Sequence, residues 1–403
     1  MIITCMIITS ALVLAATAAV PRVINVVKLG AIADGETDAT LPFHSAWASA
    51  CSSTKPATIY VPVGRYFLRS GYFHGEKCKN KGVHFVIDGT LVAPDYRNTS
   101  TNNSWIRFDK VIGVSISGGN LDGRGDSLWA CKRSSGHDCP PGAPNLEFTN
   151  SRNIVITKVT SINSQKFHMI IKDCQYVELQ GITISAPGNS PNTDGIHIEF
   201  STGITVINSR ISTGDDCVSI GPGSSNLWIE SISCGPGHGV SIGSLGWTVQ
   251  EAGVKNVTVK TATFTSTENG VRIKTWARES NGFVKGVVFE DLTMVNVDHP
   301  VIIDQNYCPH EERNCPKQVA GVTISDVRYE DIRGTSANHI GVKLDCSKEH
   351  PCIGIKMDDV KLSYKNGPAQ IYCVNAHGNA SDSGSAVVHH IMASPSPSCF
   401  LED

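Results

Sequence analysis

Short strands with alternating apolar and polar residues recur along the chain from about residue 150. One strand type covers residues 169–172, 195–198, 217–220, 239–242, 270–273, 300–303 and 341–344. A second type precedes these strands, for example at 153–156, 203–206, 226–229, 256–259 and 321–324. Alternation of this kind is typical of half-buried strands. Each repeat of 22 to about 40 residues therefore contains at least two strands.

Repeats of this length predict an all-β fold, a single-stranded right-handed parallel β-helix whose turns tolerate insertions. A doubly wound α/β fold would need helices of about ten residues between its strands, and the intervening segments lack the 3.6-residue pattern. Residues 37–51 form a short amphipathic pattern, and we expect a helix there that caps the open end of the solenoid. The Ser- and Pro-rich tail from about residue 381 to 403 is expected to be a loop.

The first 20 residues carry no charge and combine an apolar core with a small-x-small pattern. This pattern predicts a secretory signal peptide over residues 1–19, followed by a single β-helix catalytic domain over 20–403. A basic start is missing, and a buried apolar helix is the alternative interpretation. Nothing later in the chain resembles a membrane span.

The cysteine content fits an oxidising compartment. Cys5 is removed with the signal, which leaves an odd number of cysteines. Proximity along the chain predicts the pairs Cys217–Cys234, Cys308–Cys315, Cys346–Cys352, Cys373–Cys399, Cys51–Cys78 and Cys131–Cys139, with Cys174 unpaired. No CxxC pairs with matching His spacing occur, so we expect no zinc or other metal. Sequons at Asn98, Asn102, Asn256 and Asn379 agree with secretion.

The net charge of −3 gives no global field that would recruit nucleic acid or an anionic membrane. We therefore expect neither as a partner. An acidic substrate would need a local basic site.

Particular polar residues occupy the same step of successive repeats, just before the returning strand. Asp194, Asp216 and His238 follow one another at intervals of 22 residues, and Asn269 holds the same step one repeat later. Equivalent positions on neighbouring parallel strands lie about 4.8 Å apart, so we expect the carboxylates and the imidazole to form one column. Asp215 lies beside Asp216.

This column has the residues that glycoside hydrolysis requires. Closely placed carboxylates hold protons with different affinities, which separates an acid from a base. Hydrolysis of a glycosidic bond uses an acid for the leaving oxygen and a carboxylate for water or the sugar. Arg272 and Lys274, at i and i+2 of a following strand, would bind the carboxylate of a uronic acid.

Each residue also has a simpler interpretation. Asp215 and Asp216 after Gly214 are typical of a solvated turn, and His238 between two glycines is typical of a tight bend. Cations on a strand are commonly a solvated face, and residues 192–195 read as an ordinary turn. Independent turns need not fall on one 22-residue ladder, however, so the register favours the functional interpretation. Asp173 and Asp304, which lack such partners, are interpreted as structural.

Four motifs occur in order along the chain: residues 192–194 (NTD), 214–217 (GDDC), 237–246 (GHGVSIGSLG) and 272–274 (RIK). Together they resemble the polygalacturonases of glycoside hydrolase family 28, and most of all the plant pollen-type exopolygalacturonases. Thr213 stands where this family usually has Ser, and Ala39 replaces the second Asp of an amino-terminal TDDT pattern.

The resemblance implies a role for each site residue. Asp215 would be the general acid, Asp194 and Asp216 would activate the attacking water, and His238 would tune the acid or position the sugar. By the same resemblance, the galacturonate carboxylate would be bound by Arg272 and Lys274, with Tyr307 as a subsite residue and Asn192 shaping the site.

The resemblance further implies a secreted, monomeric cell-wall enzyme without a cofactor that hydrolyses the α-1,4-galacturonosidic bonds of polygalacturonate (pectin). It would act from the chain end with inversion, although a short carboxylate separation is otherwise associated with retention. The alternatives are an endo-polygalacturonase, a calcium-dependent pectate lyase, and a non-catalytic wall-binding β-helix.

Overall fold

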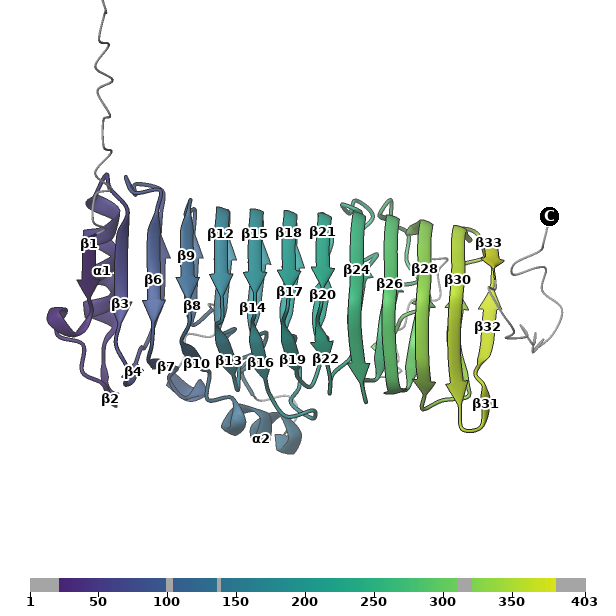
Figure 1. Cartoon of the computed structure of the whole chain (residues 1–403), viewed down its shortest axis with the longest axis horizontal. Helices are drawn as coiled ribbons and strands as arrows, with labels where there is room; N and C mark the ends of the chain where they lie inside the picture. Colours follow the sequence, from purple (N-terminus) through teal and green to yellow (C-terminus); the bar gives the residue numbers. More distant parts are fainter. Residues whose placement is uncertain (1–21, 99–103, 136–138, 310–320, 382–403) are drawn as a thin grey trace, which may run out of the picture.

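The computed structural model describes residues 22–98, 104–135, 139–309 and 321–381. These residues form an elongated stack of coils, with successive strands side by side along the long axis (Figure 1). Pairing between coils is parallel, and the antiparallel pair is the hairpin of β30 and β31. The predicted all-β parallel β-helix is therefore confirmed. The proposed signal peptide, residues 1–19, lies outside the described residues.

One wall of the solenoid is an 11-stranded parallel sheet. It contains the strand type that the sequence places at the end of each repeat. Its members are β5 (Gly71–His74), β8 (Ile106–Asp109), β11 (Leu146–Thr149), β14 (Met169–Lys172), β17 (Ile196–Glu199), β20 (Val218–Ile220), β23 (Val240–Leu245), β25 (Asn269–Thr275), β27 (His299–Asp304), β29 (Ile340–Asp345) and β32 (Gln370–Val374).

The remaining strands form a 22-stranded sheet that is bent into two columns. The first column holds β1 (Arg22–Asn25), β3 (Ala57–Val61), β6 (Val83–Ile87), β9 (Val114–Ser117), β12 (Arg152–Thr157), β15 (Gln175–Gln180), β18 (Thr202–Ile207) and β21 (Ser225–Glu230). The second holds β2 (Asp34–Asp38), β4 (Arg65–Phe67), β7 (Thr90–Val92), β10 (Asn120–Asp122), β13 (Thr160–Ile162), β16 (Thr183–Ser185), β19 (Arg210–Ser212) and β22 (Ser233–Cys234). The columns fuse in β24 (Val254–Thr265), β26 (Phe283–Val297), β28 (Thr323–Ser336) and β30 (Cys352–Tyr364), and β31 (Gly367–Pro368) and β33 (Ala376–Ser381) follow.

The N-terminal end of the stack is covered by α1 (Thr40–Ser52), which confirms the predicted cap but begins three residues later than expected. Trp47 of α1 packs against Phe73, Phe85 and Phe108, and its Nε1 donates to the carbonyl of His74 at 3.1 Å. Two 3-10 turns, η1 (Val27–Leu29) and η2 (Tyr96–Asn98), and the helix α2 (Asp126–Ser135) complete the elements. None of the described helices is both long and apolar enough to cross a membrane.

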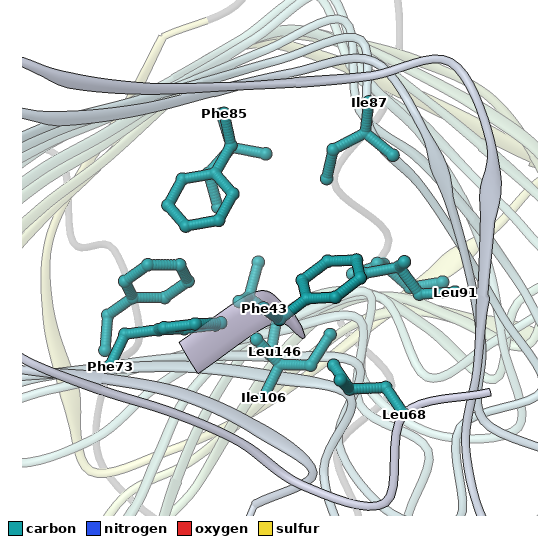
Figure 2. A pocket seen from close by; sticks show the side chains of 11 residues that line it. Phe43, Leu68, Phe73, Phe85, Ile87, Leu91, Ile106 and Leu146 are labelled. Carbon is teal, nitrogen blue, oxygen red and sulfur yellow. The ribbon is translucent and has the colours of Figure 1, made fainter. Parts of the chain in front are cut away.

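Beneath α1 the interior contains a small apolar cavity of about 20 Å³. Figure 2 shows Phe85 and Ile87 facing Ile106 and Leu68 across it. A cavity of this size has room for about one water molecule, but its lining offers no polar partner, so we expect it to stay dry. The cavity belongs to the core and not to a binding site.

The disulfides of the described residues agree with the predicted pairs. The pairs Cys51–Cys78, Cys131–Cys139, Cys217–Cys234 and Cys346–Cys352 are confirmed. Cys308 and Cys373 are also disulfide-bonded, while the expected partners Cys315 and Cys399 lie outside the described residues. Cys174 is buried and unpaired, as expected.

Candidate active site

The column of polar residues follows from the strand register. Ile196 of β17 pairs with Val218 of β20, and Val218 pairs with Val240 of β23. The positions two residues before these partners are Asp194, Asp216 and His238. The amide of Gly195 donates to the carbonyl of Asp216 at 2.8 Å, which extends the ladder to this level. The sequence expectation of a common column is therefore met by the backbone.

Asp216 is held by two cations and a hydroxyl. Arg272 Nη2 lies 2.8 Å from Asp216 Oδ1, and Lys274 Nζ lies 2.9 Å from Asp216 Oδ2. Ser241 Oγ donates to Asp216 Oδ1 at 2.7 Å and accepts from Arg272 Nε at 3.0 Å. Burial acts to raise the pKa of Asp216, but Lys274 and Arg272 outweigh it and hold that pKa at about 2. Asp216 is therefore ionised throughout the physiological range.

Asp194 has the opposite electrostatic environment. Its side chain is buried without an ion pair among the described residues, and burial raises its pKa well above the usual value. The charges of Asp215 and Asp216 add to this rise. The two carboxyl groups of the column thus differ widely in proton affinity, since Asp194 takes up a proton much more readily than Asp216.

Asp215 and His238 form a pair at the surface of the site. His238 Nδ1 lies 3.1 Å from Asp215 Oδ1, and His238 Nε2 lies 3.3 Å from Glu268 Oε2. Burial alone would lower the pKa of His238, but Asp215 and then Glu268 raise it overall. The side chain of Asp215 is 20% exposed, against 2% for Asp216. Of the two adjacent aspartates, Asp215 is therefore the one that a bound molecule can reach.

Tyr307 lies beside the two cations. Lys274 Nζ is 5.3 Å and Arg272 Cζ is 6.0 Å from the centre of its ring, and Trp276 packs edge-on against it at 5.5 Å. Asn192 is exposed in a left-handed backbone conformation with φ of 54°. Its side chain makes no hydrogen bond with any residue that the structure describes, so its contribution to the site stays a prediction.

Asp215, Asp216 and His238 place their ligand atoms within 4.8 Å of one another, a spacing that a metal ion could bridge. Asp216 is already paired with both Arg272 and Lys274, however, and these two cations would repel a metal ion. The charge distribution therefore favours an anionic ligand.

Ser241 and Glu268 contact the site residues, but neither was assigned a role from the sequence. Ser241 belongs to the 237–246 motif, but its bridge between Asp216 and Arg272 joins three separate coils. Glu268 precedes Asn269 and reaches His238 and Arg272. The contact of Ser241 could have been predicted, because this residue holds the position opposite Arg272 on the neighbouring strand. No pattern in the sequence pointed to Glu268.

A family model described as glycosyl hydrolases family 28 matches residues 51–384 of this chain. A polygalacturonase from Prunus persica is 58% identical over 359 residues, which cover 89% of this chain and 91% of that protein. An exopolygalacturonase from Platanus acerifolia is 41% identical and covers 88% and 94%.

Two solved structures share the fold. An endo-xylogalacturonan hydrolase from Aspergillus tubingensis superposes with a TM-score of 0.76 at 22% identity, covering 90% of this chain and all of that one. An exopolygalacturonase from Thermotoga maritima gives 0.70 at 20% identity, with 91% and 93% covered. At these identities the likeness concerns the β-helix alone.

Proposed function

This chain belongs to glycosyl hydrolases family 28, and on that premise we propose that it hydrolyses the α-1,4-galacturonosidic bonds of polygalacturonate. The observation that carries the proposal is the group formed by Asp194, Asp215 and Asp216 beside Arg272 and Lys274. Its carboxyls supply the acid and the base, and its cations suit an anionic sugar. No cofactor enters the proposed reaction.

Asp215 donates the proton to the leaving oxygen. It is more exposed than Asp216, and its Oδ1 lies 3.1 Å from His238 Nδ1, close enough for the imidazolium to pass a proton to it. Glu268 on the other imidazole nitrogen helps His238 keep its charge. The imidazolium of His238 can thus supply a proton to Asp215. Loss of the proton from this pair would stop cleavage.

Asp194 and Asp216 activate the attacking water. Asp216 is ionised and orients the water. Asp194 accepts the water proton when it is itself ionised, because its raised pKa gives that form the higher proton affinity of the two. The water oxygen bonds to the anomeric carbon as the bond to the leaving oxygen breaks. Attack from the opposite face inverts the configuration. Arg272 and Lys274 bind the uronate carboxylate, with Tyr307 beside it.

The proposal is tested by a reducing-sugar assay on polygalacturonate with Asp215→Asn beside the parent protein. We expect a loss of turnover of about a hundredfold or more, the usual contribution of a general acid. Asp173→Asn is the matched control, because Asp173 is exposed after β14 in the same sheet and should leave turnover unchanged. Near-parental turnover of Asp215→Asn would refute the assigned role.

A pectate lyase would share the substrate and the fold but would require calcium. We expect hydrolysis to continue in a calcium chelator, without unsaturated products that absorb in the ultraviolet. If unsaturated products form and the chelator stops their release, the protein cleaves by elimination and not by hydrolysis. Binding to polygalacturonate without any cleavage would instead identify a non-catalytic wall-binding β-helix.

We further propose that the enzyme acts from the chain end, as the name of the Platanus relative indicates for that protein. An exo-acting enzyme releases galacturonic acid while the viscosity of the polymer falls slowly. Early oligomers with rapid thinning would identify an endo-acting enzyme.

Secretion into the cell wall as a monomer is the expected setting, supported by the signal pattern over residues 1–19 and by the disulfides. Light scattering of the purified protein tests the monomeric state.

A further inference from the structure

The face of the 11-stranded sheet that carries the catalytic cations continues into an aromatic surface. Arg272, Lys274 and Trp276 alternate at i, i+2 and i+4 along β25 and its extension, so they share one side. The Trp276 ring contacts Tyr307 at 5.5 Å and Trp247 at 4.6 Å. Trp276 is buried, whereas Trp247 is 53% exposed. A continuous run of rings therefore leads from the cation pair to an accessible indole.

Arg278 packs against both indoles at the far end of this surface. Its guanidinium carbon is 4.9 Å from the Trp247 ring and 5.0 Å from the Trp276 ring. Within the part of the chain that the structure describes, its side chain forms no ion pair or hydrogen bond. By contrast, Lys172 and Lys110 of the same sheet region are paired with Glu199 and Glu76. As far as the described residues are concerned, the N–H donors of Arg278 are thus left to bind an anion.

The geometry of a stacked guanidinium suits a carboxylate. Contact with aromatic rings engages the plane of the group, while its N–H donors point outward within that plane and match a carboxylate in a bidentate manner. The exposed indole of Trp247 offers an apolar surface to the C–H face of a sugar ring. A neutral sugar would use the indole but leave the guanidinium unpaired. The combination therefore recognises a uronate.

We propose that Trp247 and Arg278 form a further subsite for a galacturonate residue that binds beyond Tyr307 and does not itself react. This inference rests on the proposed function, because it extends the same substrate along the same face. Arg278 binds the carboxylate of that residue and Trp247 packs against its ring. The subsite is occupied by substrates long enough to reach it.

The test compares Arg278→Gln and Trp247→Ala with the parent on oligogalacturonides of increasing length. We expect KM for the longer oligomers to rise about tenfold in Arg278→Gln, the usual effect of losing a hydrogen bond to a charged group. KM for these oligomers should also rise in Trp247→Ala, because the ring contact is lost, and kcat should be unchanged in both. KM for the shortest cleaved oligomer should stay at the parental value. Arg278→Lys, which keeps the charge but loses the planar fork, should give an intermediate rise for the long oligomers.

The matched controls are Arg210→Gln and Trp228→Ala, both at exposed positions of the 22-stranded sheet, and neither should change KM at any length. Unchanged KM for long oligomers in Arg278→Gln and Trp247→Ala would overturn the subsite. So would an equal rise at every length, or a lowered Tm with parental KM, which would make the pair structural. If the parent itself cleaves no polygalacturonate, the proposed function fails first, so the two failures are distinguishable.

Discussion

Lys274 Nζ lies 2.9 Å from Asp216 Oδ2, although 58 positions separate the two residues in the chain. Both side chains are buried, and Arg272 binds the other carboxylate oxygen. The cations that the resemblance assigns to the substrate therefore also hold a carboxylate of the site itself. Substrate binding and the charge state of Asp216 are coupled through the same two side chains.

Removal of Lys274 should destabilise the protein as well as impair binding. We expect Lys274→Gln to lower the free energy of unfolding by about 3 kcal/mol, because it leaves a buried carboxylate with one cation instead of two. Urea unfolding measures this loss. Lys172→Gln is the control: its pair with Glu199 is partly exposed, so the change should be below about 1 kcal/mol. Equal losses in both variants would contradict the buried-network account.

The pH dependence of turnover should reflect His238. Its raised pKa keeps the imidazolium and the shared proton to a higher pH than an ordinary histidine, so activity falls as pH rises through that value. In His238→Gln the imidazole that holds this proton is lost. The alkaline limb of the kcat profile should therefore move to lower pH. If the alkaline limb stays at the parental pH in a folded variant, His238 takes no part in the proton transfer.

The stability of the N-terminal end should depend on Trp47. This indole fills the space between α1 and three phenylalanine rings, so Trp47→Ala should cost about 3 to 5 kcal/mol. Thermal unfolding of Trp228→Ala is the comparison, because that ring is 43% exposed and its loss should be nearly neutral. A Trp47→Ala protein as stable as Trp228→Ala would show that the cap contributes little.

The thiol of Cys174 should be inert in the folded protein. Burial raises its pKa to about 12, and the thiolate is the reactive form. An alkylating reagent should therefore label Cys174 at the rate of global unfolding, as peptide mass analysis after a timed reaction would report. Labelling should accelerate sharply in urea. Rapid labelling in buffer would mean that the coil around Cys174 opens locally.

Much of the fold was predictable because its signal is repeated. The strands of the 11-stranded sheet alternate over four residues, and the common 22-residue interval already placed Asp194, Asp216 and His238 in one column. The second column was missed because strands such as Thr160–Ile162 have only three residues, too few for a period-two pattern. Helix α2 was missed because its ten residues are mostly polar and gave no clear signal.

The contacts of the site were less accessible to sequence reasoning. The bridge of Ser241 and the approach of Glu268 to His238 depend on side-chain directions across coils 25 to 31 residues apart. Arg278 illustrates the same limit, since its two indole partners come from a preceding loop and from its own strand extension. Register along a solenoid is a property of the repeat, whereas such cross-coil contacts are particular to individual residues.

The parallel register of the 11-stranded sheet means that each turn of the solenoid contributes a limited part of the chemistry. β17 and β20 follow the acids, β23 follows the imidazole, and β25 carries the cations. An exchange between related solenoids would therefore have to move the turns of β20, β23 and β25 together, because Asp216, Ser241 and the two cations contact one another across these turns. The unit that recombination can exchange is thus a block of neighbouring turns and not a single turn.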